Sequence, residues 1–395
     1  LCIHHIISDG WSLDLFRKKL LNLYLKLKEG TEIEEETGDK AFIDFVITEN
    51  EKINSGEYQH QKDYWLQEME GAKPLNLLTD FPVNSDREEY GREYQFVIED
   101  QLHEKLKEIS REQGTTLFMF LFAAFKVLLH KYTGDTDITV TSPFTNRPGL
   151  EYEEVMGYFV NLLPIRDQIE AEMSFTDFLD EVKQTIIGAY KNVQCPNNLI
   201  FRELNTTDAV ENSVFDVTFV LDSYEEGDDG LTEELEMTEI SQEFLSIPSN
   251  LMMVFQDIQD RMIGKLQYNS GLFKEETMER MSDHFIHLLK QITANPEADI
   301  SKLELIRAEE ESLILNQFND TEAAIDYERI IYDLFEKQVV ENPDQVGIVD
   351  KDNSLTYREI NQKANQLARS LREKGVKAES TVGIMVDRCP EMIIG

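Results

Sequence analysis

Hydrophobic residues recur along this chain with the spacings of both strands and helices, which predicts a mixed α/β or α+β architecture. The apolar run Leu1 to Ile7 predicts a buried strand that ends at Ser8-Asp9-Gly10. A helix is expected next, with Ser12 as its N-cap and Gly30 as its stop, because apolar residues recur every three or four positions between them. These apolar residues are Leu13, Phe16, Leu20, Leu23 and Leu27.

The central part of the chain also contains apolar patterns of both helices and strands. The segment Leu117–Tyr132 is apolar nearly all round, which is typical of a buried helix. The remaining elements expected here are helices at Leu102–Arg111 and Lys274–Thr293, strands at Asp137–Thr141, Phe215–Val220 and Arg261–Tyr268, and a loop over Ser142–Glu154.

Polar residues from Asn295 to Asp326 predict an interdomain linker, so we expect three parts: 1–300, a linker at 301–328, and 329–395. In the last part, a strand at Val346–Val349, a capping box of Thr356 with Glu359, and a second strand at Thr381–Val386 predict a βαβ unit. About 65 residues are too few to close an α/β domain of their own. The chain also starts at Leu1 and stops at Gly395 within an apolar run, and we interpret it as an internal fragment of a longer polypeptide.

Charge and cysteine content exclude several classes of function. The 395 residues include 77 Asp or Glu and 38 Lys or Arg, a formal net charge of −39. We therefore expect neither a nucleic-acid groove nor adhesion to an anionic membrane. The longest apolar stretch, Leu117–Phe125, is far shorter than the roughly 20 residues that span a bilayer. Cys2, Cys195 and Cys389 form neither a disulfide framework nor a metal-binding knuckle, so a cytoplasmic protein without a bound metal is expected.

The segment His4-His5-Ile6-Ile7-Ser8-Asp9-Gly10 is the strongest candidate for chemistry. Two adjacent histidines on a strand face opposite sides, so one can enter a cavity while the other packs inward. A histidine side chain can accept a proton from an attacking amine or hydroxyl, or orient it. Asp9 can fix the local geometry through an ion pair, and Gly10 permits a tight turn and leaves room for a substrate.

Together with Trp11-Ser12, this segment resembles the H-H-x-x-x-D-G signature of the condensation domains of nonribosomal peptide synthetases. Leu355–Asn361 resembles L-T-Y-x-E-L-N, the first core motif of the adenylation domain that follows in such enzymes. The resemblance implies a two-lobed, chloramphenicol acetyltransferase-like fold with an incomplete first lobe, then the first βαβ part of an adenylate-forming enzyme. Other segments resemble the family's motifs in the same order: Tyr64-Trp65-Leu66, Asp80-Phe81-Pro82, Met156–Arg166, Phe215–Val220 and Leu266–Phe273.

By this resemblance His5 is the catalytic residue. It positions or deprotonates the α-amino group of an acceptor aminoacyl thioester as that amine attacks a donor acyl thioester, and the sequence leaves both roles open. Asp9 is assigned a structural role and is expected to pair with Arg166, whereas His4 supports the site by packing in the core, as does Trp65. Gly157 and Asn161 are expected to shape the backbone near the substrate tunnel.

The resemblance also implies the partners and cofactors. Both substrates arrive on phosphopantetheine arms of an upstream donor and a downstream acceptor carrier domain, and no cofactor binds this chain directly. ATP and magnesium belong to an intact adenylation domain. Two segments depart from the family's motifs, Asn192–Asn198 in place of H-Q-D-Y-P-F-E and Thr207–Val214 in place of R-D-x-S-R-N-P-L, which weakens the expectation for donor-side contacts.

Three functional interpretations remain open at this point. The first is a peptide-bond-forming condensation domain. The second is the related epimerisation domain or a dual condensation and epimerisation domain, in which the base abstracts an α-proton. The third is a non-catalytic domain that only recruits carrier domains. The adenylation-like segment Leu355–Asn361 favours condensation over epimerisation, and His5, Asp9 and Gly10 favour catalysis over recruitment.

Overall fold

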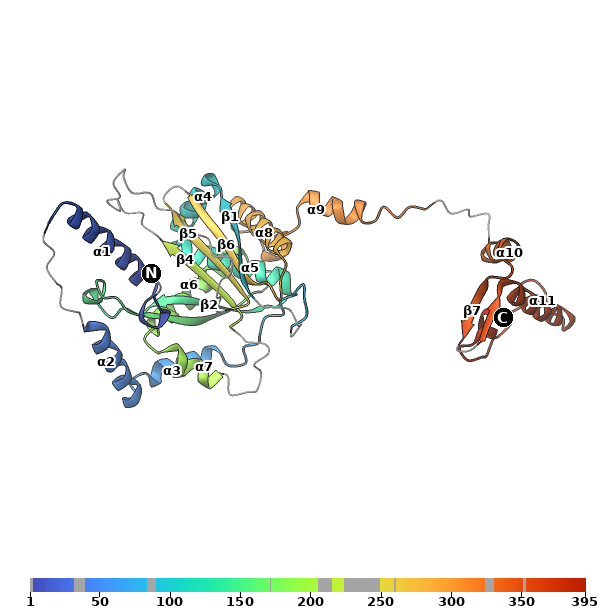
Figure 1. Cartoon of the computed structure of the whole chain (residues 1–395), viewed down its shortest axis with the longest axis horizontal. Coiled ribbons are helices and arrows are strands. Elements are labelled where there is room, and N and C mark those ends of the chain that lie inside the picture. Colours follow the sequence, from blue (N-terminus) through green and yellow to red (C-terminus); the bar gives the residue numbers. More distant parts are fainter. Residues whose placement is uncertain are drawn as a thin grey trace. The chain divides into compact units, whose positions relative to one another are not determined.

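The computed structural model describes residues 3–31, 40–83, 90–170, 172–204, 215–223, 249–258, 261–323, 330–350 and 353–395. These residues form two compact units, Leu1–Glu311 and Ser312–Gly395, and each unit is treated by itself. Both units combine helices and strands, so the predicted mixed α/β class is confirmed (Figure 1). Of the two segments that depart from the family's motifs, Thr207–Val214 lies outside the described residues.

The first unit is built on a six-stranded mixed sheet with the order β1-β6-β5-β4-β2-β3. Strands β2, β4 and β5 run parallel, whereas β1, β3 and β6 run antiparallel to their neighbours. The parallel strands therefore end on the same edge of the sheet at which β3 begins. The strands are β1 (Gly91–Ile98), β2 (Asp137–Thr145), β3 (Val160–Gln168), β4 (Val217–Ser223), β5 (Leu251–Ile258) and β6 (Arg261–Asn269).

Four helices pack against one another and against this sheet: α4 (Asp100–Glu112), α5 (Leu117–Thr133), α6 (Phe175–Lys191) and α8 (Glu275–Ala294). Thr116 caps α5 by accepting a hydrogen bond from the Met119 amide, and every residue from Phe120 to Leu129 is buried. The predictions of α4, α5, α8 and β6 are thus confirmed to within two residues. Within the described residues no single helix is long and apolar enough to cross a bilayer. One bent pair, α4 with α5 at 105°, passes a test of length and composition.

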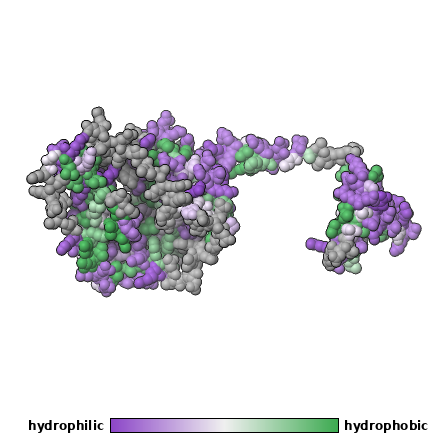
Figure 2. Space-filling model, in the orientation of Figure 1, coloured by the Kyte–Doolittle hydropathy of each residue, from purple (hydrophilic) through white to green (hydrophobic). Residues whose placement is uncertain are grey.

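The first unit also carries helices α1 (Gly10–Lys28), α2 (Ala41–Ser55), α3 (Gln59–Glu68) and α7 (Asn197–Leu204). Figure 2 shows hydrophobic side chains gathered on the side of the molecule where α1 and α2 lie. Leu20 and Leu27 on α1 and Ile43 on α2 are each more than half exposed.

The predicted strand at Leu1–Ile7 is wrong. Leu1 and Cys2 lie outside the described residues, and His5–Ile7 forms a 3-10 turn with Ile6 and Ile7 exposed. The apolar run alone indicated a strand, but a strand forms only where its backbone pairs with a neighbour, and the described part of this segment joins no sheet. The predicted N-cap is also wrong, since α1 begins at Gly10 and Asp9 accepts from the Ser12 amide.

The second unit contains α10 (Ile331–Glu341), β7 (Val346–Asp350), β8 (Asn353–Thr356), α11 (Tyr357–Glu373) and α12 (Pro390–Ile394). The predicted capping box is confirmed, because Glu359 Oε2 accepts from the Thr356 amide at 2.8 Å and Thr356 Oγ1 accepts from the Glu359 amide at 3.3 Å. Strand β7 pairs with β8 in an antiparallel hairpin. Residues 381–386 form no strand, so the second strand of the predicted βαβ unit is absent from the described residues.

Candidate functional site

The candidate site lies where the turn His5–Ile7 leads into α1. Asp9 is 2% exposed although it is ionisable, and its carboxylate is held by backbone amides on both sides. Oδ1 accepts from the Ser12 amide at 2.8 Å, and Oδ2 accepts from the Phe159 amide at 3.0 Å. Arg147 Nη2 lies 3.2 Å from Oδ1 and 3.4 Å from Oδ2. The buried carboxylate therefore has both backbone partners and a counter-charge, as a buried ion requires.

Ser12 joins the same two segments through a second set of bonds. Its hydroxyl donates to the Gly157 carbonyl at 2.7 Å and accepts from the Gly157 amide at 3.0 Å. The Asp9 amide also donates to the Gly157 carbonyl at 3.2 Å. The start of α1 is thus fastened to residues 157–159, which precede β3, by contacts that are largely independent of side-chain charge.

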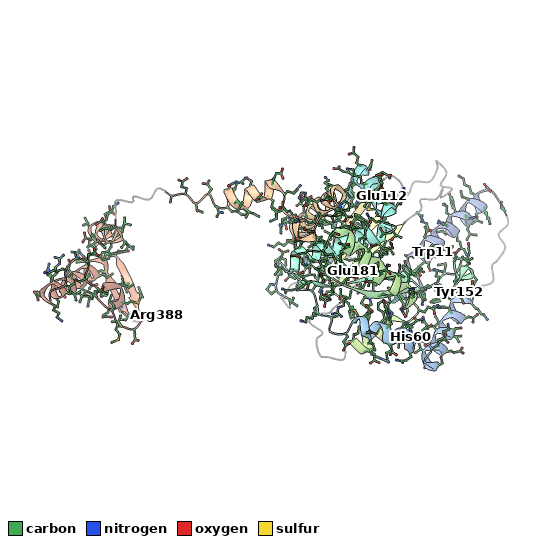
Figure 3. All side chains as sticks on the ribbon, turned by 180° about the vertical axis from the view of Figure 1, so that it is seen from behind. Trp11, His60, Glu112, Tyr152, Glu181 and Arg388 are labelled. Carbon is green, nitrogen blue, oxygen red and sulfur yellow. The ribbon has the colours of Figure 1, made fainter. Side chains whose placement is uncertain are left out.

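Arg147 has several partners in the site, although the sequence patterns did not predict a role for it. Its Nη1 donates to the Tyr152 carbonyl at 2.5 Å and to the Val155 carbonyl at 2.8 Å. The guanidinium carbon lies 4.3 Å from the centre of the Phe159 ring and 5.7 Å from that of Trp11. Burial lowers the Arg147 pKa, and the Asp9 charge opposes that shift. Figure 3 labels Trp11 and Tyr152, which lie near each other in this part of the molecule.

The predicted pairing of Asp9 with Arg166 is wrong. Arg166 forms a two-pronged ion pair with Asp137, with both N–O distances at 2.8 Å, and donates to the carbonyls of Glu68 and Glu70. The reason is strand length. Arg166 lies six residues beyond Val160 on β3, which at about 3.4 Å per residue places it about 20 Å along the strand from the end near Asp9. Arg147 follows β2 by two residues and emerges at that end.

His4 and His5 lie at the start of a 3-10 turn and not on the expected strand. Both side chains are exposed, so neither packs in the core. His4 Nδ1 accepts from the Ile6 amide at 3.1 Å, which caps the 3-10 turn and leaves Nε2 as the atom that carries the proton in the neutral ring. The His5 ring meets the Tyr158 ring edge-on, with 5.5 Å between centroids. His5 therefore presents an accessible imidazole on a turn that Asp9, Ser12 and Arg147 anchor.

The remaining predicted residues have structural contacts. Trp65 is 2% exposed, which confirms its packing role, and its indole donates to the Asn192 carbonyl at 3.0 Å. Asn161 Nδ2 donates to the carbonyls of Val193 and Cys195 at 2.6 and 3.2 Å. Both residues thus hold the segment that departs from the family's motif. Gly157 approaches α2 so closely that a Cβ would lie 2.2 Å from the Phe42 ring.

Gly10 was predicted to permit a tight turn, but the backbone at this position does not need a glycine. It is the first residue of α1, it is not among the glycines with positive φ, and a Cβ there would meet nothing within 4 Å. The backbone therefore does not require glycine, and open space lies beyond its Cα. Among the described residues, no group of three or more His, Cys, Asp or Glu side chains is arranged to hold a metal ion.

Comparisons with known proteins agree on one family. Residues 1–315 match the condensation domain, and residues 335–395 match the AMP-binding enzyme family. Gramicidin S synthase 2 of Brevibacillus brevis is 38% identical over 395 residues, which is 100% of this chain and 9% of that protein. Tyrocidine synthase 2 of Brevibacillus parabrevis is 36% identical over 402 residues, 100% of this chain and 11% of that protein.

Solved structures show the same fold. A four-domain nonribosomal peptide synthetase bound to AMP and glycine matches with a TM-score of 0.75 at 19% identity, over 95% of this chain and 29% of that one. The condensation domain of a monacolin K polyketide synthase matches with a TM-score of 0.64 at 20% identity, over 75% of this chain and 69% of that one. The chain belongs to the condensation-domain family of nonribosomal peptide synthetases, and its last 61 residues match the AMP-binding enzyme family.

Proposed function

We propose that this chain forms an amide bond between a donor acyl or peptidyl thioester and an acceptor aminoacyl thioester, with His5 as the catalytic residue. Family membership and the similarity to gramicidin S and tyrocidine synthases support this proposal. The observation that carries it is the accessible His5 imidazole on a turn whose other end, at Asp9, is buried and anchored.

The reaction needs modest acid–base help and strict placement. The acceptor nitrogen attacks the donor carbonyl carbon, a C–N bond forms, the C–S bond breaks, and the donor thiol takes up the proton that the amine loses. Only the neutral amine attacks, and an α-amino group has a pKa of about 8, so a nearby base gives a limited gain. Holding two tethered reactants in contact contributes more. His5 serves as the base or orients the amine, and Asp9, Ser12 and Arg147 keep its turn in place.

The domain assignment and the partners follow from this proposal. We assign the first unit, which ends at residue 311 and not at the expected residue 300, to the condensation domain, residues 312–328 to a linker and 329–395 to the start of an adenylation domain. The substrates are carried on phosphopantetheine arms of an upstream and a downstream carrier domain. ATP and magnesium serve the complete adenylation domain of the synthetase.

The test uses the full-length synthetase with loaded donor and acceptor carrier domains. His5→Ala is expected to reduce dipeptide formation by about 10-fold or more, because it removes both the limited help of a base and the group that orients the amine. His60→Ala replaces an exposed histidine on α3 and is the matched control, for which wild-type rates are expected. If His5→Ala formed dipeptide at the normal rate, His5 would not be the catalytic residue.

Two further outcomes separate the competing functions. If the unaltered protein binds loaded carriers but releases no dipeptide, recruitment is the better description. If the α-proton of the donor aminoacyl group exchanges with deuterated solvent and the exchange disappears in His5→Ala, the same base also epimerises. His5→Gln separates the two roles of His5. If dipeptide formation slows and its pH dependence shifts, His5 acts as the base. If the rate falls equally at all pH values, His5 positions the amine.

A further inference from the structure

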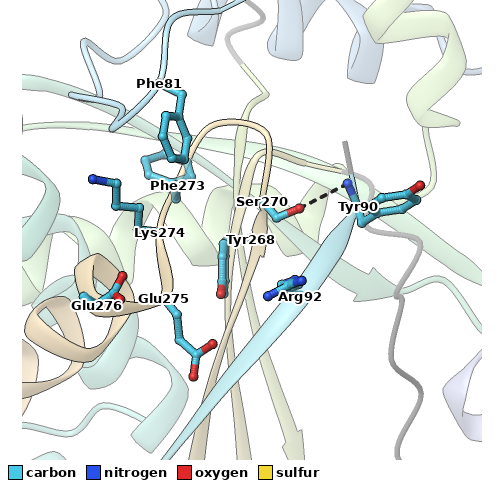
Figure 4. A pocket seen from close by; sticks show the side chains of 9 residues that line it. All are labelled: Phe81, Tyr90, Arg92, Tyr268, Ser270, Phe273, Lys274, Glu275 and Glu276. Carbon is cyan, nitrogen blue, oxygen red and sulfur yellow. Dashed lines mark hydrogen bonds between the residues drawn. The ribbon is translucent and has the colours of Figure 1, made fainter. Parts of the chain in front are cut away.

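A second candidate site lies at the other end of the sheet. A cavity of about 520 Å³ opens where β1 begins and β6 ends, at the start of α8 (Figure 4). This volume lies within the range of about 300–1,000 Å³ that is typical of small-molecule sites. His5 and Asp9 lie at the opposite edge, where β2 ends and β3 begins, so the cavity is separate from the proposed catalytic site. Its lining residues are Phe81, Tyr90, Arg92, Tyr268, Ser270, Phe273, Lys274, Glu275 and Glu276.

The walls of this cavity are fixed by backbone contacts. The amides of Asp80 and Phe81 both donate to the Leu272 carbonyl, at 2.9 and 3.2 Å. Asp80 Oδ2 in turn accepts from the Lys274 amide at 2.9 Å. On the other side, the Ser270 amide donates to the Tyr90 carbonyl at 2.9 Å. The cavity is therefore a formed feature of the fold, with the aromatic rings of Phe81, Tyr90 and Phe273 in its lining.

The hydroxyl of a buried tyrosine points into the cavity. Tyr268 is 1% exposed, and among the described residues its hydroxyl forms no hydrogen bond. Figure 4 shows this hydroxyl directed to the side of the cavity where Arg92 and Glu275 lie. A ligand in the cavity can therefore supply the hydrogen-bond partner that this hydroxyl lacks among the described residues.

Two positive side chains also line the cavity without an ion-pair partner among the described residues. Arg92 forms no ion pair with the described residues, although the chain has a net charge of −39. The Lys274 ammonium lies 5.5 Å from the centre of the Phe81 ring and has no carboxylate partner among the described residues. In addition, the side chain of the N-cap residue Lys274 does not cap the 20-residue helix α8, so the first amides of the helix add a partial positive charge at the same place.

Negative groups complete the lining. Glu275 and Glu276 form the first turn of α8 and both face the cavity. A simple anion would meet these two carboxylates, and a simple cation would meet Arg92, Lys274 and the helix amides. A ligand that carries both charges side by side avoids both conflicts.

We propose that this cavity binds a free α-amino acid with an apolar or aromatic side chain. Its carboxylate contacts Arg92 and the Tyr268 hydroxyl, its ammonium contacts Glu275, and its side chain packs on the aromatic rings. Ser270 offers a further hydroxyl next to the carboxylate. The site goes beyond the proposed condensation reaction, because that reaction uses amino acids held as thioesters and takes place at the other edge of the sheet.

The test is calorimetric titration of the whole chain with L-phenylalanine. Saturable binding is expected. N-acetyl-L-phenylalanine lacks the ammonium charge and L-phenylalaninamide lacks the carboxylate, so each is expected to bind at least 10-fold more weakly. Arg92→Gln and Glu275→Gln should each weaken L-phenylalanine binding at least 10-fold, and Tyr268→Phe at least 3-fold, because single polar partners are removed.

Control variants distinguish a local effect from a general one. Glu279→Gln changes an exposed glutamate one turn further along α8, and Lys290→Gln an exposed lysine near its end; both should bind L-phenylalanine as the unaltered chain does. Circular dichroism checks that Tyr268→Phe folds. The proposal is overturned if L-phenylalanine does not bind, if both blocked derivatives bind equally well, or if binding persists in all three cavity variants. His5→Ala is expected to leave this binding unchanged, so failure here and failure of the catalytic proposal are distinguishable.

Discussion

Asp9 and Arg147 show how single residues prepare the candidate site. The carboxylate accepts from two backbone amides that belong to segments about 150 positions apart, and the guanidinium adds contacts to two carbonyls and two aromatic rings. Because both charges are nearly buried, removing one leaves the other without a partner. The pair therefore positions the turn that carries His5.

A double-mutant cycle tests this partner assignment. Asp9→Asn and Arg147→Gln should each destabilise the protein, and the double mutant should lose less than the sum, with a coupling of about 1–3 kcal/mol in urea unfolding. Asp9→Asn with Arg166→Gln should be additive to within about 0.5 kcal/mol, because the two side chains share no partner. Coupling of Asp9 to Arg166 instead of Arg147 would contradict the arrangement described here.

A second residue-scale prediction concerns the thiol of Cys195. Burial raises its pKa to about 11, with Lys62 opposing the shift. The thiolate is the reactive form, so at pH 8 to 9 native Cys195 should react with iodoacetamide far more slowly than the partly exposed Cys389. In the unfolded chain, with an ordinary pKa of about 8.5, the difference should disappear. Mass spectrometry of the labelled peptides measures both rates.

The sign of the pH effect follows from the same shift. A raised thiol pKa means that folding favours the neutral form, so this contribution to stability is complete below about pH 8.5 and is lost as the pH rises toward 11. Equal labelling of Cys195 and Cys389 in the native protein would show that Cys195 is accessible.

At the scale of elements, aromatic packing fixes α2 against the loop before β3. The rings of Phe42 and Phe45 lie 5.3 and 4.8 Å from that of Phe159, and Phe45 also meets Tyr152 at 6.0 Å. Gly157 contacts the Phe42 ring so closely that a Cβ at this position would collide with the ring. Two segments thus approach closely only because the residue between them lacks a Cβ.

Gly157→Ala should therefore displace α2. We expect a loss of about 1–3 kcal/mol, the usual cost of overpacking, and faster proteolysis within Ala41–Ser55. Phe42→Ala placed in the same protein should recover part of that loss, since it opens space for the new methyl group. Gly10→Ala is the matched control, because a Cβ there meets nothing and no stability change is expected. Equal losses for both glycines would rule out the steric explanation.

At the scale of the whole molecule, the first unit extends beyond its last core helix. Segment Leu303–Glu311 is fastened to α8 by three contacts. Gln291 exchanges two hydrogen bonds with the backbone of Glu304, at 2.6 and 3.0 Å, and Arg307 pairs with Asp283 at 2.6 Å. His284 bonds to the Tyr132 hydroxyl at 2.7 Å and to Glu310 at 2.8 Å. Helix α9 (Ala308–Ser312) therefore starts as part of the first unit.

Replacing the buried histidine should release this segment. His284→Phe removes both hydrogen bonds and leaves the Tyr132 hydroxyl without a partner, for an expected cost of about 1–3 kcal/mol. Cleavage by a glutamate-specific protease within Glu309–Glu311 should accelerate several-fold. Arg307→Gln breaks an ion pair in which both side chains are nearly half exposed, and it should change the cleavage rate little. Unchanged cleavage in His284→Phe would show that the contact does not hold α9.

Local patterns in the sequence determined the helices with strong periodicity or clear caps, among them α4, α5, α8 and α11, because these signals involve residues within one or two turns of each other. They also identified the H-H-x-x-x-D-G segment, and with it the family. Packing of distant segments decided the rest. The registration of β2 with β3 places Arg147 rather than Arg166 beside Asp9, and the lack of a neighbouring strand leaves His5 on an exposed turn. Asp9 and Arg147 are 138 positions apart in the sequence, and contacts between such distant segments are not visible in the spacing of residues along the chain.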